Sequence, residues 1–145
     1  MKKITWIFSI VLILFTGCRK SDYLAEESAV QMYDYGQGTG TVTWTKDKQY
    51  LVEGPLFVNE GQVLTIEAGT VVRFRAGKGE NASALIVARG GKIIAIGTPA
   101  EPVIFTAEAD DLNGSVDKNA RGLWGGIIIL GNAPVNIPSG EGYME

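Results

Sequence analysis

The segment 108–121 carries several of the side chains that could bind a metal ion. Its sequence, EADDLNGSVDKNAR, places oxygen-bearing side chains at Asp110, Asp111, Asn113 and Asp117. Carboxylate and amide oxygens are the ligands that Ca²⁺ prefers in proteins. The spacing lacks the closing glutamate of a compact calcium loop, and the alternative is a polar loop with a turn at Asn113-Gly114. Calcium is the one cofactor that the sequence suggests.

The other reactive residues restrict the possible chemistry. The chain has no histidine, which excludes Ser-His-Asp and Cys-His catalysis and histidine-based metal sites. A base could come only from basic side chains such as Arg73, Arg75, Arg89 or Lys92, with the acidic residues of segment 108–121 as partners. The sequence does not bring these groups together. We therefore assign no catalytic residue, and a solvated outer face is the simpler interpretation.

Two tryptophans are candidates for contact with a glycan, because an aromatic ring can pack against a sugar. Trp44 lies in the alternating segment 41–45, TVTWT, and Trp124 opens the segment WGG. Each has a structural alternative. Trp44 could cover the first layer of a core, and Trp124 could cover a corner beside glycines that allow close approach.

These residues are attached to a pattern that the chain repeats. Residues 56–74 and 85–107 each contain an apolar-x-apolar triplet, a turn, a second triplet, a turn and a third apolar stretch, and residues 127–137 repeat the first half. Repetition at this period indicates a repeat architecture. The first triplets are Leu56/Val58, Leu85/Val87 and Ile127/Ile129, and the second are Leu64/Ile66, Ile94/Ile96 and Val135/Ile137.

The pattern predicts an all-β fold. Alternation with period 2 and enrichment in Val, Ile and Phe are typical of strands. Three short strands per repeat predict one coil of a triangular parallel β-helix, in which Val58, Val87 and Ile129 stack in one column. Glycines such as Gly91 are expected at corners, where a sharp bend can need a positive φ. An antiparallel sandwich or barrel is the alternative, but the recurring order of elements favours the β-helix.

Residues 1–17 have the features of a bacterial export signal. Two lysines precede an apolar run, 4–15, which is too short to span a bilayer comfortably. The run ends in Phe15-Thr16-Gly17-Cys18, which resembles a lipobox. The resemblance implies cleavage before Cys18, lipidation of its thiol and anchoring to the membrane without spanning it. Because Arg19 follows the cysteine, lipoprotein sorting rules imply the outer membrane, with the periplasmic and cell-surface faces both open.

The chain thus divides into three parts. Residues 1–17 form a lipoprotein signal peptide, 18–41 the lipidated Cys18 and a flexible Gly/Ser-rich tether, and 42–145 the β-helix domain. Two polar segments, 76–83 and 108–121, should project from one corner as insertions. The net charge of −3 argues against a nucleic-acid partner.

Three segments together resemble a known family. They are YLVEGPLFVNEGQVLTIEAGTVVRF, ALIVARGGKIIAIGTPAEPVIFTA and GLWGGIIILGNAPVNI. They resemble a family of exported proteins and lipoproteins common in Bacteroidetes-type bacteria. The resemblance implies a right-handed, pectin-lyase-like parallel β-helix, here of about three coils, but no activity. Family members are usually longer, which implies an N-terminal fragment or shortened relative with an open C-terminal coil.

We therefore expect a cell-envelope lipoprotein whose β-helix is a scaffold for binding, adhesion or structural display rather than an enzyme. The expected partners are the membrane, through the N-terminal lipid, a glycan or envelope protein, and a second copy at the open end. The alternative is a polysaccharide lyase or hydrolase whose catalytic coils lie beyond residue 145. Carboxylates stacked beside Arg73 or Lys92 would favour that alternative, because lyases on β-helices use acidic Ca²⁺ ligands and a basic side chain.

Overall fold

The computed structural model describes residues 29–134, and within them the chain forms short strands and one 3₁₀ turn. The strands are β1 (Ala29–Met32), β2 (Val42–Trp44), β3 (Gln49–Val52), β4 (Pro55–Val58), β5 (Val63–Ile66), β6 (Val71–Phe74), β7 (Ala84–Val87), β8 (Lys92–Ala95), β9 (Ile104–Ala107) and β10 (Gly126–Ile129), with the 3₁₀ turn η1 (Gly79–Asn81) before β7.

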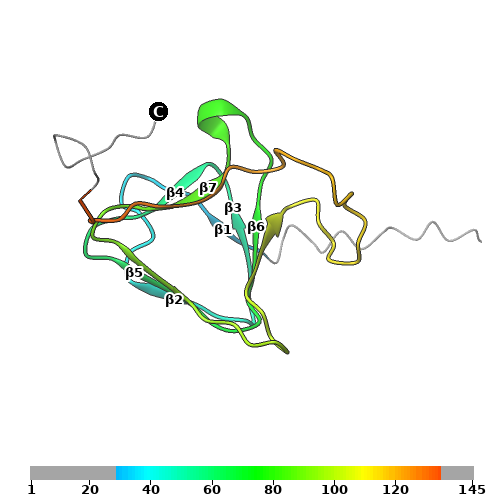
Figure 1. The fold of residues 1–145 in the computed structure, drawn as a ribbon, viewed down its shortest axis with the longest axis horizontal. Helices are drawn as coiled ribbons and strands as arrows, with labels where there is room; N and C mark the ends of the chain where they lie inside the picture. Colours follow the sequence, from blue (N-terminus) through cyan, green and yellow to red (C-terminus); the bar gives the residue numbers. More distant parts are fainter. Residues whose placement is uncertain (1–28, 135–145) are drawn as a thin grey trace, which may run out of the picture.

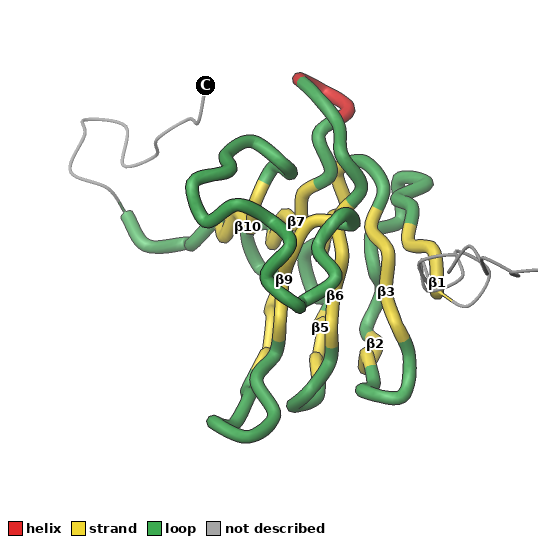
Figure 2. Tube along the Cα trace, turned by 90° about the vertical axis from the view of Figure 1, so that its right-hand side faces the viewer, coloured by secondary structure: helices red, strands yellow, loops and turns green. Residues whose placement is uncertain are grey.

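The strands build three parallel sheets that enclose a triangular core (Figure 1). Their orders are β1-β3-β6-β9, β10-β7-β4 and β2-β5-β8, so the chain visits each sheet in turn and returns one layer further along. Figure 2 shows successive layers following one another from β1 to β10. The predicted parallel β-helix is confirmed.

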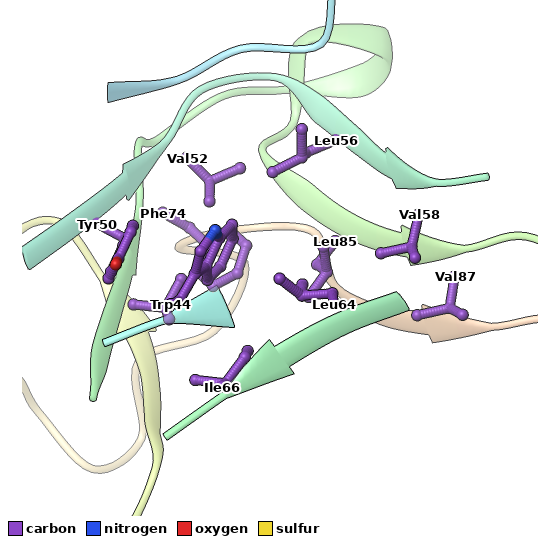
Figure 3. Close-up of a cluster of buried hydrophobic side chains, with 11 residues drawn as sticks. Trp44, Tyr50, Val52, Leu56, Val58, Leu64, Ile66, Phe74, Leu85 and Val87 are labelled. Carbon is purple, nitrogen blue, oxygen red and sulfur yellow. The ribbon is translucent and has the colours of Figure 1, made fainter. Parts of the chain in front are cut away.

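The core is a continuous stack of apolar side chains contributed by all three sheets (Figure 3). Val58 pairs with Val87, and Val87 pairs with Ile129, as the repeat predicted. Leu56 and Leu85 form a second such column and are almost fully buried. No coil can bury these side chains alone, so each layer depends on its neighbours.

The register of β8 differs from the prediction. The triplet of Ile94 and Ile96 was expected to point inward, but Ile94 pairs with the outward Thr65, and Ile96 is 73% exposed. Ile93 pairs instead with the buried Leu64 and packs against the core. The isoleucines at positions 93, 94 and 96 allow two alternating patterns, one with Ile93 pointing inward and one with Ile94 and Ile96 pointing inward. A shift of one residue in register exchanges the two faces of a strand. The four-residue turns before β5 and β8 have equal length, and this sets the observed register.

The β-helix begins earlier than the sequence suggested. β1 falls inside the predicted flexible tether and pairs along its whole length with β3. Residues 34–40 then lie against β4, where the amide of Thr39 donates to the carbonyl of Phe57 at 2.7 Å. The segment takes the place of a strand, and the tether prediction is wrong for residues 29–41.

Asp34 fixes this first layer. Its Oδ1 accepts hydrogen bonds from the amides of Gly36 and Gly38, at 2.6 and 3.1 Å, and its Oδ2 accepts one from the amide of Phe57 at 3.0 Å. One carboxylate therefore stabilises the turn at residues 34–38. It also accepts a hydrogen bond from the backbone amide of Phe57 on the edge strand β4, which would otherwise be open to pairing.

Replacing Asp34 with alanine should lower the free energy of unfolding by about 2 kcal/mol, because three charge-assisted hydrogen bonds disappear. Urea denaturation followed by circular dichroism measures the change. Asp34→Asn keeps one acceptor oxygen and should lose roughly half as much. Equal stability of the alanine variant and the wild type would contradict the assigned role.

The two predicted insertions leave from the same corner. Residues 75–83, with η1, connect β6 to β7, and residues 108–125 connect β9 to β10. Both connections run from the four-stranded sheet to the sheet of β4, β7 and β10 (Figure 1). Because they join equivalent points of successive coils, the expectation of one projecting corner is confirmed.

Candidate functional site

The outer face of the four-stranded sheet gathers two of the basic side chains that the sequence singled out, together with two carboxylates. On β6 the buried Val72 and Phe74 alternate with Arg73, which is half-buried and faces outward. Arg75 follows in the same outward row, one residue beyond the strand. Parallel pairing in register places the equivalent residues of neighbouring coils beside these arginines.

Arg75 lies between two carboxylates from adjacent coils. Its Nη1 contacts Glu53 Oε2 at 2.5 Å, and its Nη2 contacts Glu108 Oε1 at 3.3 Å. The three side chains are partly exposed, between 27% and 39%. The acidic partners thus come from the coil before and the coil after, so the column ties three layers together.

Arg73 forms a second, neutral set of contacts in the same sheet. Its Nη1 donates to Gln49 Oε1 at 3.2 Å, and its Nε donates to the carbonyl of Asp110 at 3.3 Å. The carboxylate of Asp110 in turn accepts hydrogen bonds from the hydroxyl of Thr106 and the amide of Leu112. Arg73 therefore holds the start of the 108–125 connection against the sheet.

A phenol extends the Arg75 column toward the first layer. Tyr33 lies beside Glu53, whose carboxylate raises the pKa of the phenol, with a smaller contribution from desolvation, while the Tyr33 hydroxyl donates a hydrogen bond to Gln31 Oε1 at 2.5 Å. Because the Tyr33 hydroxyl is exposed, its raised pKa comes from the neighbouring Glu53 carboxylate and does not indicate a buried site. Glu53, Arg75 and Glu108 thus form a charged column across three coils, with Tyr33 beside its first member.

The other two basic candidates lie elsewhere. Lys92 is on β8, in the sheet of β2 and β5, and Arg89 is in the turn before it. Neither Lys92 nor Arg89 lies on the sheet that carries Arg73 and Arg75. Of the four proposed bases, two share the face with the carboxylates, although it is Arg75 rather than Arg73 that is flanked by them.

The proposed calcium ligands do not converge. Asp111 accepts hydrogen bonds from the Asn113 amide at 2.9 Å and the Ser115 hydroxyl at 2.8 Å, and these bonds lower the pKa of Asp111. Asp117 accepts from the Asn119 amide at 2.7 Å, within its own turn. Within residues 29–134 no group of three metal-binding side chains could hold an ion. Asp111 and Asp117 thus accept hydrogen bonds from their own loop segments.

Both tryptophans pack on the core, Trp44 fully buried and Trp124 partly exposed, and for Trp124 the glycan contact stays a prediction. Trp44 is 1% exposed and stacks on Tyr50 with ring centroids 4.8 Å apart. Trp124 stacks on Phe74 at 4.1 Å and covers the core from the 108–125 connection. Trp44 has no free face for a sugar, so its proposed glycan contact is wrong. Its ring belongs to the buried core cluster.

Comparison with protein families supplies the decisive similarity. A model described as a pectate-lyase-like beta helix domain matches residues 36–145. The chain belongs to this family. Comparisons with curated proteins and with solved structures gave no match. The beta helix family accounts for the parallel coils described above, and its match begins at Gly36, in the first layer that Asp34 holds.

Several predictions lie outside the described residues of this β-helix. They concern the signal peptide, the lipidation of Cys18, and the triplet of Val135 and Ile137. Between residues 29 and 134 the structure contains no helix of sufficient length and apolarity to span a membrane.

Two residues of the outer face escaped sequence reasoning. Glu53 lies between two strands and Tyr33 lies in the supposed tether, so neither stood near a reactive residue in sequence. The signal that could have found Glu53 is the spacing of 22 residues that separates it from Arg75, because the same spacing relates Tyr50 to Val72.

Proposed function

We propose that the protein is a lipid-anchored β-helix of the bacterial outer membrane that acts as a scaffold for binding, adhesion or structural display. The observation that supports this proposal most directly is that outward charged side chains bind residues of neighbouring coils. Arg75 bridges Glu53 and Glu108, and Arg73 holds Gln49 and the backbone of Asp110. A guanidinium between two carboxylates keeps its proton, which makes it a poor base and a good cross-link.

The lipid anchor is proposed from Cys18, which precedes β1 by 11 residues. An extended chain of that length reaches roughly 35 Å, so the N-terminal layer would stay near the membrane. Stable anchoring needs more than one acyl chain, as lipoprotein modification supplies.

Lipidation is tested by substituting Cys18. In cells fed radiolabelled palmitate, the full chain should carry label and sediment with outer membranes, and Cys18→Ser should lose the label and leave the membrane pellet. Thr16→Ser, which changes a small residue two positions before the cysteine, serves as the matched control and should behave as the wild type. Retention of Cys18→Ser in the membrane fraction would refute the anchor.

A second candidate function is carbohydrate cleavage. The family description favours it. The carboxylates lie beside Arg75, however, and not beside Arg73 or Lys92, where a lyase-like cluster was expected. Release of unsaturated fragments from polygalacturonate by the full chain, abolished in Glu53→Gln, would support this function over the scaffold.

Two exposed isoleucines in the last described coil support self-association of the protein. Ile127 and Ile129 pair with the buried Leu85 and Val87, yet they are 37% and 65% exposed. Within residues 29–134, β10 is an edge strand of its sheet. An apolar edge of this kind is a template for pairing with another strand, from the same protein or a second copy.

A further inference from the structure

A shallow pocket lies on the outside of the N-terminal layer, away from the arginine face. Its volume is about 400 Å³, and it is lined by Asp34, Gly36, Pro55, Phe57 and Asn59. It is an open depression on the surface rather than an enclosed cavity. Phe57 and Asn59 face outward, because the intervening Val58 points into the core.

The pocket is built on fixed backbone. Asp34 holds the amides of Gly36, Gly38 and Phe57, and Thr39 donates to the carbonyl of Phe57. Gly38 is held so closely that a Cβ atom there would lie 2.7 Å from that carbonyl. A site that needs no reorganisation on binding loses less free energy to ordering.

The lining offers one apolar surface and one uncommitted amide. Pro55 and the ring of Phe57 form the apolar part. The side-chain amide of Asn59 has no hydrogen bond to another described residue, and its nitrogen lies against Gly38, 2.7 Å from the position that a Cβ atom would take there. A free amide can both donate and accept, which suits a vicinal pair of hydroxyl groups.

The charge of the pocket selects the class of ligand. Asp34 is the only charged residue among the five that line it, and no lysine or arginine does so. An anionic sugar would meet a carboxylate without a compensating cation, which is unfavourable.

From these observations we propose that the pocket binds a neutral saccharide, with Phe57 packing against the sugar ring and Asn59 hydrogen-bonding its hydroxyl groups. The inference rests on the proposed binding role and names its ligand class and site. Phe57 and Asn59 are binding residues in this proposal, and Asp34 positions them.

The test uses the full chain extracted in a detergent whose headgroup is not a sugar. Maltotriose, cellotriose and mannotriose are titrated separately, with trigalacturonate as the anionic trisaccharide of equal length. We expect at least one neutral trisaccharide to shift the NMR signals of the Asn59 side-chain amide, and trigalacturonate to bind about tenfold more weakly or not at all. Absence of a response to all three neutral sugars, or equal binding of trigalacturonate, would overturn the proposal.

Variants locate the binding. Phe57→Leu keeps apolar volume but removes the ring, and Asn59→Asp keeps the shape but adds a charge, so each should weaken binding about tenfold or more. Ile86→Leu changes the outward neighbour of Phe57 on the next coil and serves as the matched control. Circular dichroism melting shows whether each variant is folded.

The outcomes separate the two proposals. Wild-type affinity in folded Phe57→Leu and Asn59→Asp would place the sugar elsewhere and refute the pocket, but it would leave the binding role of the protein intact. A Cys18→Ser protein that stays on the membrane would refute the lipid anchor and leave the pocket unaffected.

Discussion

Replacing Trp44 with alanine should lower the free energy of unfolding by about 3–5 kcal/mol, the range of aromatic-to-alanine changes in a packed core. The side chain is 1% exposed, is the largest among the fully buried ones, and stacks on Tyr50. Figure 3 shows it among side chains from all three sheets. Removing the indole would leave a cavity in the first layer of the β-helix core and expose the apolar side chains packed beside it.

Guanidinium chloride denaturation measures this loss, and Trp44→Phe is the matched control. The indole Nε1 of Trp44 is buried and has no hydrogen-bond partner within the described residues. Phenylalanine keeps an aromatic face for Tyr50 and removes an unsatisfied donor, so it should cost roughly 1–2 kcal/mol. If both variants lost the same free energy, packing on Tyr50 would not be the source of the stability.

The substitution Gly91→Ala should destabilise the fold by about 3 kcal/mol, at the upper end for an overpacked site. A Cβ atom at Gly91 would lie 2.3 Å from the carbonyl oxygen of Val58 and 3.0 Å from that of Asn59. Both are backbone atoms of the preceding coil, so no side chain can rotate away. The two coils would have to separate at this corner, against the hydrogen bond from the Ala88 amide to the Val58 carbonyl.

Gly131→Ala provides the control for Gly91→Ala. The nearest atom to a Cβ at Gly131 is 3.9 Å away, so the change should stay within about 0.5 kcal/mol of the wild type. Differential scanning calorimetry of both variants compares a crowded and an open corner directly. Similar melting temperatures for the two would contradict the close approach of the coils.

Gly91 also shows why a corner glycine can be needed for different reasons. The sequence suggested a bend that requires a positive φ there. In the structure it is Gly90 that has the positive φ, at 78°, while Gly91 is required by the space between coils. A glycine pair in a turn indicates the corner, but not which residue bends and which one touches the neighbouring coil.

The repeating apolar pattern was sufficient to predict the parallel β-helix, because stacked coils need the same inward residues at the same intervals. It correctly aligned Val58, Val87 and Ile129, and it located both insertions at one corner. The family match to residues 36–145 agrees with that prediction. This part of the structure is local and periodic, and such information is present in the order of the residues.

The first layer and the charged face depended on contacts between residues distant in sequence. β1 and residues 34–40 have no apolar repeat, and they join the fold only because β3 and β4 present open edges to them. Glu53, Arg75 and Glu108 meet because one coil lies on the next. β8 shows the same limit in a single strand, since the choice between Ile93 and Ile94 as the inward residue followed from pairing with β5 and from the length of the preceding turn.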